Sequence, residues 1–270
     1  MTTMTPLLYE WTAPLALVLY LLLFVLTVRA SAVLLQRLLL FVALVSHGAT
    51  VLPGWFAGQD FQFGFANSVS WTLWLMVLLV WLESWFQRLP KATAGIYPFA
   101  AIAVFLPLVF PGTVRIAELS TLFRVHILLA MLAYGAFTVS AAQAVLMSWL
   151  ERSLHRGGQS SHWLDDLPSL LDLDAALQRS MAAGLVLVSL TLATGVWVNL
   201  FLGYGPLKAD HKTIFTVLTW LMVVGFFLGR WRWGWRGRVA ARFALAGFGL
   251  LLLAYVGSRF VVEVLILPPA

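Results

Sequence analysis

Three of the five histidines lie at or beside the ends of long apolar stretches: His47, His126 and His211. A neutral imidazole can ligate haem iron axially, and ligation by two histidines needs side chains on separate elements that face each other across the porphyrin. His126 and His211 meet this requirement, because they stand at the beginnings of two different stretches. They are therefore a candidate pair of metal ligands. The alternative is that each is a helix-end histidine that hydrogen-bonds a carbonyl group or water.

Other polar residues could assist this pair. His47 is a reserve ligand, although its sequence context Ser46-His47-Gly48 equally allows a histidine that forms hydrogen bonds within a helical core. Asp210 immediately precedes His211. Four cations could neutralise the two propionates of a haem or, alternatively, contact lipid headgroups: Arg115, Arg124, Lys208 and Lys212.

Aromatic side chains are concentrated after residue 53, at Trp55, Phe56, Phe61, Phe63 and Phe65. They could form a platform for a flat apolar ligand at the membrane surface. Tryptophan and other aromatic residues also gather in a belt at the level of the lipid headgroups. The thirteen tryptophans of the chain favour the belt.

Motifs of conventional catalysis are missing from the sequence. There is no Walker motif, no serine nucleophile elbow, no carboxylate cluster of metal-ligand spacing and no HExxH pattern. Glu83, Arg259 and Glu263 could form a proton path, but the four-residue spacing of Arg259 and Glu263 favours an ion pair on one helix face. We therefore expect a binding or assembly protein and not a conventional enzyme.

The composition is that of a polytopic membrane protein. Of the 270 residues, 61% are hydrophobic and 10% are charged, and the mean hydropathy is +0.92. The net charge of +6 is divided among short connections and forms no continuous basic face, so we expect no nucleic-acid partner. The absence of cysteine excludes disulfides, thiolate metal sites and covalent attachment of haem to this chain.

Eight stretches are long and apolar enough to cross a membrane as helices, which need about 20 residues. They are 7–28, 34–53, 67–86, 94–110, 122–148, 180–202, 213–229 and 241–264. The first lacks a basic n-region and a small-residue cleavage site, so we expect it to be retained. The predicted fold is an all-α bundle of eight transmembrane helices in one membrane domain.

The basic residues predict the orientation of this bundle. Five arginines follow the seventh stretch, interleaved with tryptophans: Arg230, Arg232, Arg236, Arg238 and Arg242. Most other lysines and arginines of the connections fall on the same side, which the positive-inside rule places in the cytoplasm. Both termini and the connections 54–66, 111–121 and 203–212 then lie outside. The three histidines share that outer side of a bacterial inner membrane.

One long polar connection, 151–179, falls on the cytoplasmic side. Its second half alternates leucines and aspartates, which predicts a broken amphipathic segment at the membrane interface. Its acidity argues against binding to anionic lipid, and it could instead face a protein partner.

Three stretches resemble the CcsA/HemX group of cytochrome c assembly membrane proteins, and most closely its YpjD-like inner-membrane members. The first is HILLAMLAYGAF at 126–137. The second runs from 167–170 to GLVLVSLTLATG at 184–195. The third runs from DHKT at 210–213 through TWL at 219–221 to GWRGR at 234–238. The likeness extends over nearly the whole chain, and GWRGR is its most specific part. The resemblance implies handling of haem at the outer membrane face, by a tryptophan-rich outer loop between two histidines.

The resemblance can be followed residue by residue. It makes His126 the first flanking histidine, and it matches Asp210, Lys212 and Thr213 to the end of the outer loop. The tryptophan-rich WxWD part is missing from 203–210, and 250–267 contains no second flanking histidine. His211 is then the substitute ligand. These departures favour haem binding or an accessory role over complete delivery of haem to apocytochrome.

The resulting hypothesis is a haem-handling membrane protein of the cytochrome c assembly type. In it, His126 and His211 ligate the iron, and the partners are membrane lipid, haem and other cytochrome assembly or membrane proteins. The alternative is a permease-like or scaffolding membrane protein with structural histidines and a cytoplasmic partner bound to 151–179.

Overall fold

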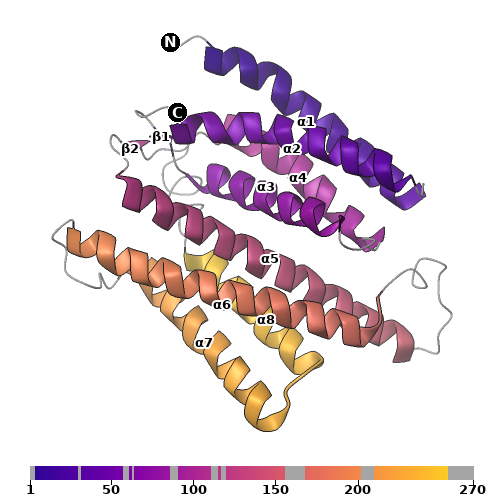
Figure 1. Ribbon diagram of the computed structural model, residues 1–270, viewed down its shortest axis with the longest axis vertical. Coiled ribbons are helices and arrows are strands. Elements are labelled where there is room, and N and C mark those ends of the chain that lie inside the picture. The colour runs from indigo at the N-terminus through magenta and orange to yellow at the C-terminus, as the bar shows by residue number, and fades with distance from the viewer. Residues whose placement is uncertain are drawn as a thin grey trace. The chain divides into compact units, whose positions relative to one another are not determined.

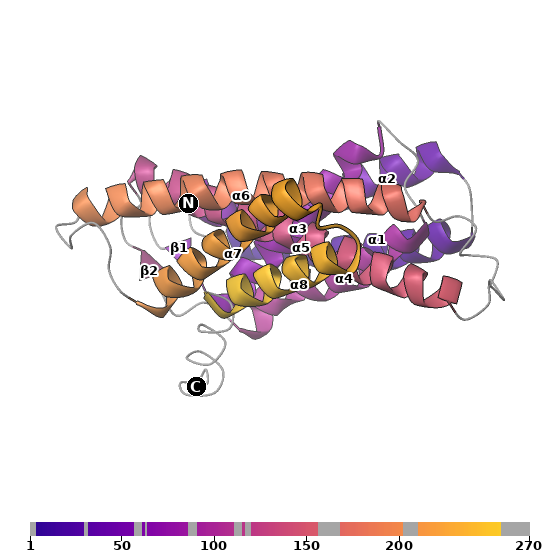
Figure 2. The same ribbon diagram turned by 90° about the horizontal axis from the view of Figure 1, so that it is seen from below.

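The computed structural model describes residues 4–29, 32–56, 61–62, 64–85, 91–110, 115–116, 120–155, 168–201 and 210–254. The helices are α1 (Met4–Arg29), α2 (Val33–Phe56), α3 (Phe65–Glu83), α4 (Ile96–Val109), α5 (Thr121–His155), α6 (Leu170–Phe201), α7 (His211–Trp233) and α8 (Arg238–Leu252) (Figure 1, Figure 2). A 3-10 helix, η1 (Lys91–Gly95), precedes α4. Strand β1 (Phe61–Gln62) pairs antiparallel with β2 (Arg115–Ile116), a short ladder that the apolar pattern did not predict.

Six of these helices are long and apolar enough to cross a membrane: α1, α2, α3, α5, α6 and α7. This confirms the predicted all-α, multi-pass membrane protein. The other two predicted spans are shorter in the described residues. Together with the preceding turn, α4 forms an apolar helix over Thr93–Val109. Helix α8 ends at Leu252, and residues 255–264 of the predicted span 241–264 lie outside the described residues.

Helices α5 and α6, with 35 and 32 residues, extend beyond the predicted spans. The first turn of α6 explains part of the extension. Ser169 caps this helix, because its hydroxyl oxygen accepts a hydrogen bond from the backbone N–H of Asp172 (3.2 Å). The aspartate-rich end of the connection 151–179 is therefore the beginning of α6, and 156–167 lie outside the described residues.

The chain divides into two compact units, residues 1–119 with 259–270 and residues 120–258. In the first unit, α1 packs on α2 and α4, and α3 packs on the same two helices. Ala13, Ala16, Tyr20 and Leu23 are completely buried along one face of α1. Small residues let helix backbones approach closely where lipid provides no hydrophobic driving force between helices. The alanines of α1 therefore favour close packing in this unit.

In the second unit, α5 packs along α6 and α8, and α7 packs on α8 and α6. The buried ring of Phe137 on α5 is a centre of this packing. A Cβ atom at Gly184 of α6 would lie 2.7 Å from that ring, and one at Gly247 of α8 would lie 3.2 Å from it. Both glycines therefore make room for the same phenyl ring.

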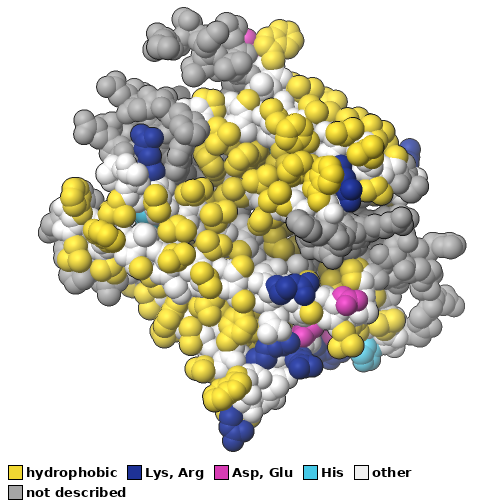
Figure 3. All heavy atoms as spheres, viewed as in Figure 1, with side chains coloured by type: hydrophobic (Ala, Val, Ile, Leu, Met, Phe, Trp, Pro, Cys, Tyr) yellow, Lys and Arg dark blue, Asp and Glu magenta, His cyan; other side chains and the backbone are white. Residues whose placement is uncertain are grey.

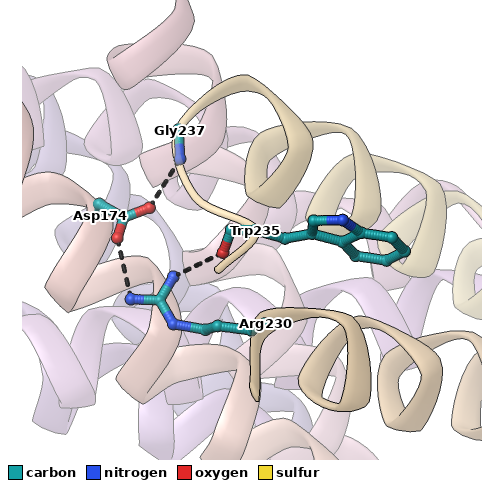
Figure 4. Close-up of polar contacts among 4 residues, drawn as sticks. All are labelled: Asp174, Arg230, Trp235 and Gly237. Carbon is teal, nitrogen blue, oxygen red and sulfur yellow. Dashed lines mark hydrogen bonds and ion pairs between the residues drawn. The ribbon is translucent and has the colours of Figure 1, made fainter. Parts of the chain in front are cut away.

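The carboxylate of Asp174 on α6 forms hydrogen bonds with the turn between α7 and α8 (Figure 4). Asp174 accepts one hydrogen bond from Nη2 of Arg230 (3.1 Å) and another from the backbone N–H of Gly237 (2.9 Å). Arg230 also donates to the carbonyl oxygen of Trp235 (3.2 Å). Gly234 and Gly237 have φ angles of 68° and 57°, which glycine adopts without steric cost. The sequence GWRGR is thus a structural turn joined to α6.

Trp235 packs this turn against the two helices that it connects. Its indole lies against Gly229 of α7, where no space remains for a Cβ atom. On the other helix it stacks on Phe243 of α8, with ring centroids 5.3 Å apart and planes inclined by 28°. The hydrogen bonds of Asp174 and the ring contacts of Trp235 therefore stabilise the same end of the second unit.

Candidate functional site

His126 lies in the second turn of α5 and contacts α6. Its Nδ1 atom is 3.0 Å from the hydroxyl oxygen of Thr194. The imidazole also stacks on Phe123, with centroids 6.2 Å apart and planes inclined by 18°. A Cβ atom at Gly195 would approach Cε1 of the imidazole to 3.2 Å. The glycine next to Thr194 thus leaves the space in which this half-buried ring lies.

The contacts of Thr194 indicate the tautomer of His126. The hydroxyl of Thr194 donates to the carbonyl oxygen of Leu190 (2.8 Å) and is also near that of Thr191 (3.1 Å). A hydroxyl has one proton, so its oxygen is left to accept a hydrogen bond from the imidazole. This arrangement favours the tautomer in which Nδ1 carries the proton and Nε2 carries the lone pair. Neutral imidazoles in this tautomer bind metals through Nε2.

His211 is the first residue of α7, and its side chain is exposed. Asp210 caps the helix by accepting a hydrogen bond from the backbone N–H of Thr213 (2.9 Å). Partial burial would raise the pKa of Asp210, but the hydrogen bonds from Thr213 and the positive charge of Lys212 outweigh it and lower the pKa below its usual value. His211 therefore lies at a fixed helix start beside an ionised carboxylate.

His126 and His211 belong to the same end of the second unit. The indole N–H of Trp220 on α7 donates to the hydroxyl of Ser189 on α6 (2.8 Å), which aligns the two helices. Both helices run from this contact towards the connection between them (Figure 1). At about 1.5 Å per residue, Thr194 lies about 8 Å from the contact and His211 about 14 Å, in the same direction. Both histidines therefore lie towards the same end of the second unit.

Two of the predicted propionate partners are described near these histidines. Arg124 lies on α5 two residues before His126, and Lys212 follows His211 on α7; both side chains are half-buried. The side chains of Arg115 and Lys208 lie outside the described residues. The described end of the second unit therefore carries two imidazoles with one cation beside each.

His47 has a different environment, in the core of the first unit. It is 0% exposed, and both ring nitrogens have partners. Nδ1 lies 3.1 Å from the hydroxyl of Tyr20 on α1, and Nε2 lies 3.0 Å from the hydroxyl of Ser70 on α3. The ring of Tyr20 stacks on Tyr97 of α4. His47 therefore connects three helices, as expected of a core hydrogen-bonding histidine.

The other residues singled out from the sequence contribute little to the described site. Phe65 is buried and packs edge-on against Phe110 in the first unit, with centroids 5.4 Å apart. The following side chains lie outside the described residues: Trp55, Phe56, Phe61, Phe63, Glu83, Arg259 and Glu263. Where side chains are described, no three or more His, Asp, Glu or Cys residues form a metal-binding group. Axial ligation of haem needs only two.

Two features of the structure are not evident from the sequence pattern. Thr194 and Gly195 position His126 from a helix that is distant in sequence, and only their place in the stretch 184–195 pointed to them. From the sequence, Asp174 belongs to the predicted amphipathic segment at the membrane interface, and Arg230 belongs to the arginines that predict the orientation. Their contact across 56 positions has no local periodicity that could have predicted it.

The sequence is similar to those of several known proteins. The inner membrane protein YpjD of Escherichia coli (strain K12) is 28% identical over 173 residues, 63% of this chain and 64% of that protein. An uncharacterized 28.8 kDa protein of Azospirillum brasilense is 32% identical over 141 residues, 52% of each chain. The cytochrome c biogenesis protein CcsA of Prochlorococcus marinus (strain MIT 9515) is 36% identical over 90 residues, 33% of this chain and 28% of that protein.

The matched region spans less than two thirds of the length of each of these curated relatives. No solved structure matches the chain significantly. The model of the family described as cytochrome C assembly protein matches residues 6–266, which is nearly the whole sequence. With its apolar helices and this match over almost its full length, the chain belongs to the cytochrome c assembly protein family.

Proposed function

We propose that this protein handles haem in cytochrome c assembly and binds it at the outer face of a bacterial inner membrane, between His126 and His211. The main support is the 3.0 Å contact between Nδ1 of His126 and Thr194, because it leaves Nε2 as the metal-binding nitrogen. The names of two relatives, an inner membrane protein and a cytochrome c biogenesis protein, agree with this role.

Each residue of the site has a task that follows from its contacts. Thr194 orients the imidazole of His126 and increases the basicity of Nε2, as hydrogen-bond partners of metal-bound histidines do. Gly195 leaves room for the ring. Asp210 fixes the start of α7 and thereby the backbone position of His211. Haem, when bound, would supply an iron that His126 and His211 would ligate.

Arg124 and Lys212 are the proposed partners of the haem propionates. A hydrogen bond between a cationic side chain and a carboxylate is about twice as strong as a neutral one. The two cations lie within two residues of the two proposed ligands in the sequence, so the same end of the unit carries positive charge for the acidic edge of the macrocycle. Arg115 and Lys208 would add positive charge from the connections.

The proposed orientation has both chain ends and the histidine end outside. Along α5, His126 and Arg152 are separated by about 39 Å, and along α7, His211 and Arg230 by about 28 Å. These lengths are close to or above the 30 Å or so of a bilayer's hydrocarbon core. Trp197 near the histidine end and Trp231 at the arginine end are 65% and 85% exposed, as expected of tryptophans at the two interfaces.

The absence of cysteine makes the orientation easy to test. A membrane-impermeant maleimide applied to intact cells should label Ser120→Cys, at the histidine end, and should not label Arg236→Cys, in the α7–α8 turn. Both positions are exposed. Labelling of the second variant alone would contradict the orientation.

Haem binding is tested by titrating the detergent-purified protein with haemin. His126→Ala and His211→Ala should each lower the affinity at least tenfold, in the range found when metal-site interactions are lost. His155→Ala is the matched control, because His155 is exposed at the opposite end of α5. Equal affinities of all three variants would favour the alternative of structural histidines in a permease-like or scaffolding protein.

A further inference from the structure

A pocket of about 370 Å³ lies between α5 and α8 at the end of the second unit opposite to the histidines. Ser148, Glu151 and Arg152 of α5 and Arg238, Ala241, Arg242 and Leu245 of α8 line it. The haem-binding proposal uses none of these residues. Figure 3 shows several Lys and Arg side chains gathered in the lower part of a largely hydrophobic face, where the α7–α8 turn lies in Figure 1.

The lining has an excess of positive charge. It contains three arginines and one glutamate, and the glutamate is already paired: Nε of Arg238 donates to Glu151 at 2.8 Å. Within the described residues, Arg152 and Arg242 have no carboxylate partner, and both are exposed. The pocket therefore offers two guanidinium groups to an anion, and guanidinium groups bind phosphate oxygens in a bidentate manner.

The pocket continues into an apolar surface. On α5, Ser148 follows Val145 by three residues and Arg152 follows Ser148 by four, so the three lie on one helix face. On α8, Leu245 follows Arg242 at a spacing of three. Val145 is 57% exposed and Leu245 is 39% exposed. Arg238 contacts Glu151, and further along the carbonyl oxygen of Leu251 accepts a hydrogen bond from Tyr134, so α5 and α8 run antiparallel. Arg238 lies near the level of Arg152, and Arg242 lies about one turn deeper. On each helix the apolar residue lies deeper than the arginine of the same helix.

We propose that this pocket binds an anionic phospholipid, with the phosphate between Arg152 and Arg242 and the acyl chains along Val145 and Leu245. Basic pockets between transmembrane helices recognise anionic headgroups in this manner. A soluble phosphate compound would use the same arginines, but it would gain nothing from the exposed apolar residues below them. The lipid is therefore the ligand that matches both parts of the pocket.

The test uses the full-length protein in detergent, titrated with phosphatidylglycerol or with phosphatidylcholine of the same acyl chains, and native mass spectrometry to count bound lipid. Phosphatidylglycerol should bind more tightly. An arginine near an anionic lipid contributes about a fivefold change in affinity. Arg152→Gln combined with Arg242→Gln should therefore weaken phosphatidylglycerol binding roughly 25-fold.

The matched control combines Arg179→Gln with Arg232→Gln, two exposed arginines outside the pocket, and should leave the affinity nearly unchanged. Ser148→Glu adds negative charge while keeping every arginine, and it should also weaken binding. Equal losses in the pocket and control variants would overturn the proposal in favour of unspecific surface charge. Displacement of the lipid by inorganic phosphate or glycerol phosphate at equal concentration would overturn it in favour of a soluble ligand.

Discussion

Replacement of Asp174 by alanine should destabilise the end of the protein where α6, α7 and α8 meet. The carboxylate of Asp174 accepts hydrogen bonds from Arg230 at 3.1 Å and from the backbone N–H of Gly237 at 2.9 Å (Figure 4). The side chains of Arg230 and Asp174 are only 14% and 11% exposed. The substitution therefore leaves the backbone N–H of Gly237 without its acceptor. It also leaves a nearly buried guanidinium group without its carboxylate partner, with only the carbonyl oxygen of Trp235 as acceptor.

The expected cost follows from this burial. Removing one partner of a buried ion pair costs about 3–5 kcal/mol, because the remaining charge is left uncompensated. The unpaired N–H of Gly237 costs about 1–3 kcal/mol, part of which water at the helix end recovers. We expect the free energy of unfolding to fall by about 4 kcal/mol. The pair of Arg238 and Glu151 is a matched contrast: the arginine is 59% exposed, so Glu151→Ala should cost less than about 1 kcal/mol.

Denaturant unfolding of the detergent-solubilised protein, followed by tryptophan fluorescence, measures both variants on one scale. Trp235 lies in the affected turn and is one of the thirteen tryptophans that contribute to the signal. Asp174→Asn keeps one acceptor oxygen but loses the charge, so its stability should lie between those of the wild type and Asp174→Ala. Equal costs of Asp174→Ala and Glu151→Ala would refute the reasoning, since burial would then make no difference to the value of the contact.

Three further predictions follow from single contacts. Thr194→Val should lower haem affinity about tenfold through loss of the hydrogen bond to the imidazole, whereas Thr191→Val, one turn earlier, should not; haemin titration measures both. Gly184→Ala should cost about 1–3 kcal/mol, because its Cβ atom would lie 2.7 Å from a buried ring. Gly225→Ala should be neutral or stabilising in the same unfolding assay, since no atom lies within 4 Å. The pKa of Asp210 is lower in the folded protein than in the unfolded chain. Its cap should therefore stabilise α7 fully at pH values above the ordinary pKa of about 3.9, and this stabilisation should be lost as the pH falls through the folded-state pKa. The melting temperature of Asp210→Asn should then be lower than that of the wild type at neutral pH, and the difference should disappear in acid.

Six of the eight predicted spans are long apolar helices in the described residues, and they could be predicted because a membrane imposes a length and an apolar composition on each of them. The end of the connection 151–179 could not, because its leucines and aspartates suit either an interfacial segment or the first turns of a long helix. The contact of Asp174 with Arg230 selects the long helix. Such a contact depends on which helix faces approach, and hydropathy does not contain that information.

The candidate site was predictable as residue types but not as geometry. His126 could be singled out as a helix-end histidine, yet its tautomer depends on Thr194, which is 68 positions away. The neighbours of His47 in the sequence allow either a reserve ligand or a histidine that forms hydrogen bonds within the core. The hydroxyl groups of Tyr20 and Ser70, on two other helices, favour the structural one.

The central claim is that the imidazole of His126 is an axial ligand of haem, and chemical rescue tests it most directly. The visible absorption spectrum of haem-loaded wild-type protein should show low-spin iron. His126→Gly should lose that spectrum and regain it when free imidazole is added, because the ligand enters the space left by the side chain. His155→Gly should retain the low-spin spectrum throughout. A low-spin spectrum of His126→Gly without imidazole, or no haem uptake by the wild type, would contradict the account.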